Sequence, residues 1–312
     1  MGLLEVKDVK KTYGKRKAVD GLSFSVQEGE VYGLLGPNGA GKSTMLAMIC
    51  GLLKMDQGSI CIGGVNINKR PQEAKRKLGV VPQEPALYPT LSAEENLRFW
   101  GTMNGISPGD ILPAVKKALQ VVGLEERARG RVDQFSGGMK RRLNIAAGLI
   151  HNPEVLVMDE PTVGIDPQSR KHILETVKML KRQGMTIIYT GHYVEEIEYL
   201  CDRVGIMDSG KMILEGTIAE LLSNGSEYQQ LRIILDRMPK EIPQAVESIP
   251  GVERAFSQEK TLNIVTLNAE RILPSAFEAI VGLGVSVSEI KITKPSLESL
   301  FLEETGKALR DN

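Results

Sequence analysis

The sequence contains few cysteines, and they are not arranged to bind a metal or to pair. Cys50, Cys61 and Cys201 are odd in number and lack the spacing of metal ligands. Unpaired thiols are typical of proteins that are kept in a reducing compartment. The N-terminal residues also lack the layout of a signal peptide. We therefore expect a cytoplasmic chain without disulfides.

Long apolar runs and an excess of one charge are also missing. The longest apolar stretch, residues 45–53, is far shorter than the roughly 20 residues that a membrane helix requires. The 39 basic residues are balanced by 39 acidic ones, so the chain has no overall basic field for nucleic acid. The sequence thus predicts no membrane span and no nucleic-acid partner, and any transport role would require other subunits.

The chain of 312 residues is long enough for two domains of ordinary globular composition. Short apolar segments alternate with helical patterns up to residue 223, and the stretch at about residues 90–150 is mainly helical. The sequence Asn-Gly-Ser at residues 224–226 is the best candidate for a linker. We therefore expect one domain over residues 1–223 and a second over residues 224–312.

One glycine-rich loop matches the phosphate-binding pattern G-x-x-x-x-G-K-[ST] in full. It follows an apolar run at residues 31–35 that indicates a buried strand, and it precedes a helical pattern at residues 43–53. Glycines let successive backbone N–H groups face one concavity, and the helix N-terminus adds its positive dipole. The lysine supplies a charge for the outer phosphates and the serine hydroxyl a ligand for Mg²⁺. The loop consists of Gly36, Pro37, Asn38, Gly39, Ala40, Gly41, Lys42, Ser43 and Thr44.

A second glycine-rich helix start follows later in the chain. Ser136, Gly137 and Gly138 open a helical pattern that continues to Ile150. Its N-terminus is a second end suited to binding an anion. Two such ends in one chain favour a nucleotide-binding role over a purely structural one.

Polar side chains stand directly beyond three of the predicted strands. Gln83, the pair Asp159 and Glu160, and His192 each follow a short apolar run. In an open α/β sheet the carboxyl ends of the strands face the ligand crevice. The adjacent acids suit Mg²⁺ binding by Asp159 and orientation or deprotonation of a water by Glu160. Alone, Gln83 and His192 would pass for ordinary loop residues, but their shared position favours a role at the ligand.

Tyr13 lies on a turn between two predicted strands that precede the phosphate loop. An aromatic side chain at such a place can close a small apolar cluster. It can also stack on the flat face of an adenine ring. The other motifs favour stacking.

The C-terminal part has the order of elements β-α-β-β-α-β, followed by an amphipathic helix at residues 296–304. This order resembles a split βαβ unit. The segment contains no cluster of histidine, cysteine or acidic residues that indicates catalysis.

Taken together, the motifs resemble the nucleotide-binding subunit of an ATP-binding cassette (ABC) transporter over about residues 3–222. The resemblance implies an α/β fold, namely a P-loop NTPase cassette with a RecA-like core, an antiparallel β subdomain and a helical subdomain, and here also a small α+β C-terminal domain. The corresponding motifs are the Walker A loop at 36–44, the signature at 135–139, the Walker B strand at 155–160, the D-loop at 163–166, the Q-loop residue Gln83, the switch histidine His192 and the adenine-stacking Tyr13.

Some positions depart from the family pattern. Met139 replaces the usual glutamine of the signature and Phe135 the usual leucine. Val163 and Ile165 vary the D-loop. None of these changes removes the serine and glycine N–H groups that would face phosphate, so they put only details of coupling in doubt.

The resemblance implies that ATP and Mg²⁺ bind here and that ATP is hydrolysed. Glu160 would be the general base, and Lys42 and His192 would contact the γ-phosphate. Ser43, Gln83 and Asp159 would surround Mg²⁺. The signature helix that starts at Ser136 would cover the ATP of a second cassette. The remaining nucleotide-binding positions carried over from the family are Tyr13, the rest of the loop from Gly36 to Thr44, Gly137, Gly138 and Asp166.

The tail at residues 295–302 is similar to the C-terminal extension of ABC-2-type exporter ATPases, which include drug, antibiotic and sodium efflux systems. This implies integral membrane permease subunits as partners, a second cassette in a homodimer, and a place on the inner face of the cell membrane. An importer ATPase with a regulatory tail is one alternative. A soluble ABC ATPase acting on nucleic acid or the ribosome is another, although the single phosphate loop, the neutral charge and the absence of a coiled-coil pattern count against it.

Overall fold

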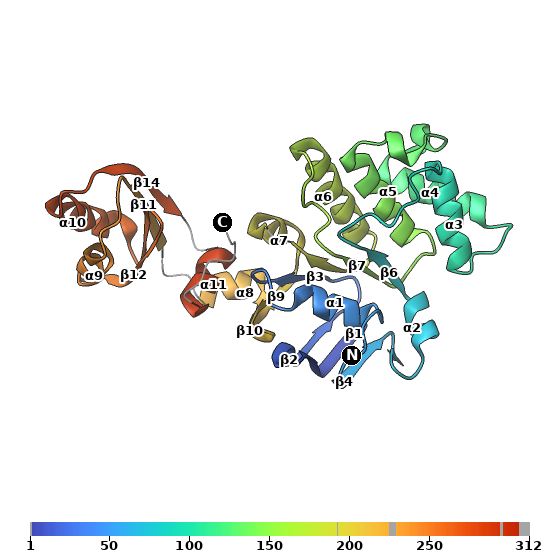
Figure 1. The fold of residues 1–312 in the computed structure, drawn as a ribbon, viewed down its shortest axis with the longest axis horizontal. Helices are drawn as coiled ribbons and strands as arrows, with labels where there is room; N and C mark the ends of the chain where they lie inside the picture. The colour runs from blue at the N-terminus through green and yellow to red at the C-terminus, as the bar shows by residue number, and fades with distance from the viewer. Residues whose placement is uncertain (1, 192, 225–228, 294–295, 306–312) are drawn as a thin grey trace. The chain divides into compact units, whose positions relative to one another are not determined.

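The computed structural model describes residues 2–191, 193–224, 229–293 and 296–305 of the chain. The chain divides into two compact units, the first formed by residues 1–218 and the second by residues 219–307 (Figure 1). The sequence placed the boundary at residue 223, at the end of the short helix α8 (Ile218–Asn224) instead of at its start. No described helix is long and apolar enough to cross a membrane.

A six-stranded sheet forms the core of the first unit. Its strands are β3 (Val31–Leu35), β6 (Leu78–Val81), β7 (Val155–Met158), β8 (Thr186–Thr190), β9 (Arg203–Asp208) and β10 (Lys211–Thr217). They lie in the order β10-β9-β3-β8-β7-β6, and only β10 runs antiparallel to its neighbour. Strands β3, β7 and β8 are buried along their whole length, as expected for parallel strands covered on both faces.

The register of these strands brings their carboxyl ends to one edge of the sheet. Leu34 near the end of β3 pairs with Thr190, the last residue of β8. Met158 at the end of β7 pairs with Tyr189 on one side and with Val81 on the other. The segments that follow β3, β6 and β7 therefore leave the sheet at the same edge, which is the arrangement that the sequence predicted for the ligand crevice.

A smaller antiparallel sheet belongs to the same unit. Its strands lie in the order β2-β1-β4-β5, with β1 (Leu4–Tyr13), β2 (Arg16–Val26), β4 (Gln57–Ile62) and β5 (Val65–Asn66). Side chains of this sheet, of the core sheet and of helix α1 (Lys42–Ile49) share one hydrophobic cluster, in which Met45 and Met48 are fully buried. The cluster thereby fixes the helix that begins at the phosphate loop between the two sheets.

Three helices, drawn in teal to green in Figure 1, form the stretch that was predicted to be mainly helical, and we call them the helical group. Helix α3 (Ala93–Met103) begins with the capping box of Ser92 and Glu95. Helix α4 (Ile111–Val122) ends at Gly123, whose φ of 62° suits a left-handed C-cap. Helix α5 (Gly137–Leu149) packs against both of them and against β6. The other helices of the unit are α2 (Pro71–Arg76), α6 (Pro167–Arg182) and α7 (Val194–Leu200).

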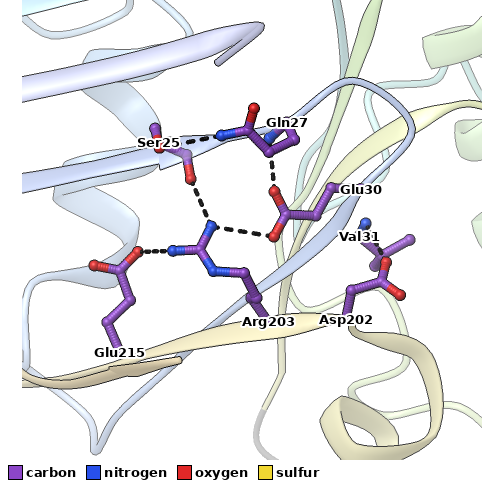
Figure 2. A network of polar contacts seen from close by, with 7 residues as sticks. All are labelled: Ser25, Gln27, Glu30, Val31, Asp202, Arg203 and Glu215. Carbon is purple, nitrogen blue, oxygen red and sulfur yellow. Dashed lines mark hydrogen bonds and ion pairs between the residues drawn. The ribbon is translucent and has the colours of Figure 1, made fainter. Parts of the chain in front are cut away.

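An ion-pair network lies at the opposite edge of the core sheet (Figure 2). Arg203, the first residue of β9, donates hydrogen bonds to Glu30 at 3.2 Å and to Glu215 of β10 at 2.6 Å. It also donates to the backbone carbonyl of Ser25 at 3.1 Å. Glu30 is buried and accepts a second hydrogen bond from the Gln27 N–H at 2.6 Å. A buried carboxylate requires such partners, so the network fixes the end of β2 to the start of β9 and to β10.

Two expectations about local structure were wrong. The first helix was predicted over residues 43–53 but ends at Ile49, because Gly51 adopts a left-handed φ of 61° and turns the chain away. Leu52 is consequently 76% exposed. The helices α2 and α7 were not predicted at all, since each has only about two turns and a weak apolar period.

The second unit has the element order that the sequence predicted. A four-stranded sheet lies in the order β12-β13-β11-β14, with β11 (Gln229–Leu235), β12 (Val252–Gln258), β13 (Thr261–Thr266) and β14 (Val287–Thr293). Helices α9 (Glu241–Glu247) and α10 (Ala269–Gly282) bury the apolar face of the sheet, and their contacts form a separate core. A last helix, α11 (Leu297–Thr305), follows.

Candidate functional site

The loop between β3 and α1 is shaped by close backbone approaches that only glycine permits. A Cβ atom on Gly41, whose φ is 108°, would lie 2.3 Å from the Ala18 carbonyl oxygen. A Cβ atom on Gly36 would lie equally close, 2.3 Å, to the Met207 carbonyl oxygen. The loop therefore lies directly on the neighbouring strands β2 and β9, and helix α1 begins at its end, which gives the loop the positive end of a helix dipole.

Lys42 is held in this loop with its ammonium group removed from water. The side chain is 5% exposed, and Nζ donates hydrogen bonds to the carbonyl oxygens of Gly36 at 2.6 Å and Pro37 at 3.1 Å. Burial lowers the pKa of Lys42, whereas the carboxylates of Glu160 and Asp159 act in the opposite direction. A partly desolvated cation in a fixed position binds phosphate more strongly than a solvated one.

A cavity of about 490 Å³ opens beside this loop. Its lining brings together Tyr13, the phosphate loop that follows β3 and the acid Glu160 that follows β7. Tyr13 was predicted on the turn between the first two strands but belongs to the first of them, because β1 and β2 pair as far as Tyr13 and Arg16. Tyr13 is the last residue of β1 and is 51% exposed, so its ring is available for stacking. The lining residues are Tyr13, Arg16, Ala18, Asn38, Gly39, Gly41, Lys42, Ser43, Thr44 and Glu160.

The two acids that follow β7 are positioned by a threonine on β8. The Thr190 hydroxyl donates a hydrogen bond to Asp159 Oδ1 at 2.8 Å and accepts one from the Glu160 N–H at 3.0 Å. Glu160 is only 6% exposed and has a left-handed φ of 48°, an arrangement that costs about 1–3 kcal/mol for a residue other than glycine. Strain of this kind persists where the surrounding structure holds a side chain in a required direction.

Gln83 reaches the same acids from the loop after β6. Its side-chain amide donates a hydrogen bond to Glu160 Oε2 at 3.1 Å. The loop itself is held by helix α5. Arg141 donates a hydrogen bond to the Gln83 carbonyl. Asn144 donates to the Pro82 carbonyl before Gln83 and accepts from the Ala86 N–H after it. From helix α3, Trp100 donates to the carbonyl of Ala86 at 2.9 Å. The helical group is thus connected to Glu160 through Gln83.

The glycine-rich start of α5 lies elsewhere and does not contribute to the lining of the described cavity. Ser136 caps the helix by accepting a hydrogen bond from the Met139 N–H at 3.2 Å. Gly138 allows helix α6 to approach so closely that a Cβ atom would meet Ser169 Oγ at 2.0 Å. Asp166 caps α6 by accepting from the Ser169 N–H at 2.9 Å, and this bond lowers the pKa of its carboxyl. Within one chain Ser136 and Asp166 are therefore helix caps, and none of these residues lines the described cavity.

A buried glutamate connects the segment that contains Thr162 to strand β8. Glu196, 1% exposed on α7, accepts hydrogen bonds from the Thr162 hydroxyl at 2.8 Å and from the Tyr189 hydroxyl at 2.7 Å. Arg170 of α6 donates to its other oxygen at 2.5 Å. These bonds fix the turn after Glu160 and the end of β8 to each other.

The structure brings most of the predicted residues together and adds three that sequence reasoning missed. His192 lies outside the residues that the structure describes. Arg16, which donates to the Gly39 carbonyl at 3.0 Å, lies three residues after Tyr13 and could have been noticed as a cation near the loop. Thr190 and Glu196 gave no signal, because a threonine in a strand and a glutamate in a helix are ordinary residues.

A second, more apolar cavity of about 400 Å³ is lined by the segment that follows α1, by β6 and the loop after it, and by helices α2, α3 and α5. It is lined by Pro82 and Ala86, which flank the Gln83 loop, and by the indole of Trp100. The exposed Leu52 stands at its rim. We call this cavity the apolar groove; its complete lining is Cys50, Leu52, Lys75, Leu78, Val80, Pro82, Ala86, Trp100, Asn104, Asn144, Ala147, Gly148 and His151.

Comparison with known proteins gives consistent results. A family model described as ABC transporter matches residues 19–163. The linearmycin resistance ATP-binding protein LnrL of Bacillus subtilis is 48% identical over 99% of this chain and 100% of its own length. The Nod factor export ATP-binding protein I of Paraburkholderia xenovorans is 38% identical over 99% of this chain and 98% of its own length.

Solved structures resemble the first unit. The ATP-binding subunit of an ABC transporter is 32% identical, with a TM-score of 0.65 over 71% of this chain and 92% of the other. A dimeric ATP-binding cassette in a post-hydrolysis state, bound to ADP and phosphate, is 28% identical, with a TM-score of 0.63 over 69% of this chain and 98% of the other.

Proposed function

Since this chain belongs to the ATP-binding proteins of ABC transporters, we propose that it is the ATPase that drives a membrane exporter of drugs or antibiotics. Relatives that match it over almost their whole length are named for linearmycin resistance and for Nod factor export, which supports export over import. The cavity beside the phosphate loop is the single observation that carries the assignment, because it joins Tyr13, Lys42 and Glu160 at one place.

The chain's own residues divide the work of ATP hydrolysis. Tyr13 stacks on the adenine, and the N–H groups of the loop with Lys42 hold the phosphates. Glu160 orients the attacking water and accepts its proton. Gln83 holds the Glu160 carboxylate, and Thr190 holds its backbone N–H. His192 contacts the γ-phosphate in this proposal, by its match to the switch histidine of the family.

The donor set at the loop and the acids fits a magnesium ion. Asp159 offers a carboxylate oriented by the Thr190 hydroxyl at 2.8 Å, and Ser43 offers an exposed hydroxyl on the wall of the cavity. The Gln83 side chain provides a third oxygen. When bound, Mg²⁺ neutralises charge on the phosphate oxygens.

The site is completed by a second cassette. The start of α5 carries an anion-binding N-terminus, yet its residues do not line the described part of the ATP cavity of the same chain. We infer that Ser136, Gly137 and Gly138 cover the ATP of a second copy, with Asp166 nearby, in a homodimer. The dimeric cassette that resembles this chain supports the arrangement.

Mixed dimers test this assignment. Paired with an inactive Glu160→Gln chain, a Ser136→Ala chain should hydrolyse ATP like a wild-type chain in the same pairing, because its own site uses the intact Ser136 of the partner. When both substitutions are placed in one chain of the pair, the site of the wild-type partner should lose activity. Ser136 also caps α5, so Ser136→Ala should lower the free energy of unfolding by about 0.5–2 kcal/mol. Ser92→Ala, which removes the cap of α3, is the matched control, because it should cause a similar loss of stability without touching the ATP site. A defect that remains in the same chain as Ser136→Ala would contradict the two-cassette site.

The permease partner requires a surface on the first unit, and we assign it to the apolar groove. Its walls include Pro82 and Ala86, so an inserted segment would press on the loop that holds Gln83 against Glu160. This gives a direct route from the membrane subunits to the acid that hydrolyses ATP. Docking there would place the chain on the inner face of the membrane.

The chain is further proposed to consist of a nucleotide-binding domain over residues 1–223, with a helical subdomain at about 90–150, and an accessory domain over residues 224–312. The separate cores of the two compact units support this division.

A further inference from the structure

The four-stranded sheet of the second unit, which we call the accessory sheet, has two outer strands, and β14 is one of them. Strand β14 pairs with β11 on one side, and no other described strand pairs with it. Edge strands are usually protected by proline, by a bulge, by exposed charged side chains or by an inward-pointing charge. β14 runs for seven residues without proline, and its one register irregularity lies at its start, beside Leu235. Its protection is therefore limited to the exposed charges of Glu289 and Lys291, which oppose pairing only with a strand that places a like charge opposite them.

The apolar face of the sheet continues onto this strand without being covered. Ile292 lies opposite Leu231 and Ile290 lies opposite Ile233, so each pair points to the same face. Leu231 and Ile233 are fully buried in the core beneath the helices. In contrast, Ile290 is 38% and Ile292 is 42% exposed. The chain's own helices thus leave an apolar strip at the edge uncovered.

The opposite face of β14 carries two charges that are arranged symmetrically. Glu289 and Lys291 flank Ile290, both are exposed, and neither makes an ion pair with a described residue. When the strand meets a copy of itself antiparallel with Ile290 opposite Ile290, Glu289 of each copy lies opposite Lys291 of the other. A shift by one residue would place Ile290 opposite Lys291 and mix the two faces. Side-chain pattern and charge therefore select the same register.

We infer that β14 pairs with β14 of a second copy of this chain, antiparallel and centred on Ile290. The pairing joins two accessory sheets into one and brings the apolar strips of both into contact side by side. It requires no nucleotide, so it is a contact between copies that is separate from the ATP-bound cassettes, and it does not depend on the proposed function.

A charge exchange in the full-length chain tests the register. Sedimentation is measured without nucleotide and with EDTA, where the ATP-dependent contact cannot form. Glu289→Lys or Lys291→Glu alone replaces two attractive pairs by two repulsive ones, which should raise the dimer dissociation constant by about tenfold. The double variant should restore it. A chain that stays monomeric at high concentration, or single variants that associate like the wild type, would overturn the inference.

Cross-linking gives an independent readout of the same geometry. In a Cys61→Ser background, Ile290→Cys should form a covalent dimer on oxidation, because opposite residues of antiparallel strands have Cα atoms about 4.5–5.5 Å apart. Ser288→Cys, on the same face, is the control, because the two copies of that residue would be more than about 13 Å apart. Equal cross-linking at both positions, or none at Ile290→Cys, would refute the pairing and leave the hydrolysis assays of Glu160 unaffected.

Discussion

The Gln83 amide and the Glu160 carboxylate are joined by a hydrogen bond of 3.1 Å between the segments that follow two adjacent strands. Gln83 belongs to a loop that Arg141 and Asn144 of α5 hold from behind. A movement of the helical group would therefore change the position of the carboxylate. The contact offers a physical connection between the surface of this cassette and its hydrolytic centre.

Glu160→Gln should separate binding from hydrolysis. The amide keeps the shape of the side chain but cannot accept a proton from water, so the turnover number should fall by roughly 10²–10⁴, the usual worth of a general base. ATP binding should remain, since the loop and Lys42 are unchanged. Phosphate release and equilibrium ATP binding are the two measurements.

Glu125→Gln is the control for this change, because Glu125 is an exposed acid outside the cavity lining. It should hydrolyse ATP like the wild type. If Glu160→Gln also did so, another group would have to be the base.

Sequence pattern was sufficient to predict the phosphate loop, the two acids and the strands before them. The reason is that a buried parallel strand must be apolar along its length and the polar residue after it must face the crevice, so β7 and the acids Asp159 and Glu160 were predictable from local sequence alone. The capping box of Ser92 and Glu95 was likewise predictable, because the two residues are only three positions apart.

Contacts between distant segments could not be predicted in this way. Thr190 touches both acids only because β7 and β8 are neighbours in register, and Glu196 meets Thr162 only after α7 packs against the end of β8. The early end of α1 at Ile49 depends on the conformation of Gly51. These features follow from tertiary packing and leave no local pattern in the sequence.

Thr190→Val should impair hydrolysis and magnesium dependence together. The change keeps the shape of the buried side chain but removes the hydroxyl that binds Asp159 and the Glu160 N–H. Leaving a buried partner unsatisfied costs about 1–3 kcal/mol. Misplaced acids should lower the turnover number by roughly ten- to a hundredfold and raise the Mg²⁺ concentration needed for half-maximal activity. Thr190→Ser, which restores the hydroxyl, should recover most of the turnover number and of the Mg²⁺ affinity. If it does not, the loss in Thr190→Val results from altered packing and not from the missing hydroxyl.

Leu52→Glu should weaken permease binding without affecting the isolated ATPase. The leucine is 76% exposed at the rim of the apolar groove, so its replacement disturbs no core. Burial of such a side chain in an interface contributes about 1.5–3 kcal/mol, which corresponds to roughly 10- to 100-fold in affinity. Co-purification of the integral membrane subunits from solubilised membranes measures the loss. Leu112→Glu, at a leucine that is 52% exposed and not part of the groove lining, should co-purify like the wild type.

His151 should make the folded chain less stable in mild acid. Its Nε2 lies 2.9 Å from the Leu78 carbonyl, and its Nδ1 is buried without a described partner. Burial lowers the pKa of His151 below the ordinary 6.5. The unfolded chain therefore takes up the proton first, so the free energy of unfolding is unaffected above about pH 6.5 and decreases as the pH falls below it. His151→Gln cannot take up this proton, and its thermal midpoint should fall less than that of the wild type between about pH 7.5 and 5.5. His172→Gln, at an exposed histidine, is the control, and an equal decrease in His151→Gln and the wild type would contradict the assignment.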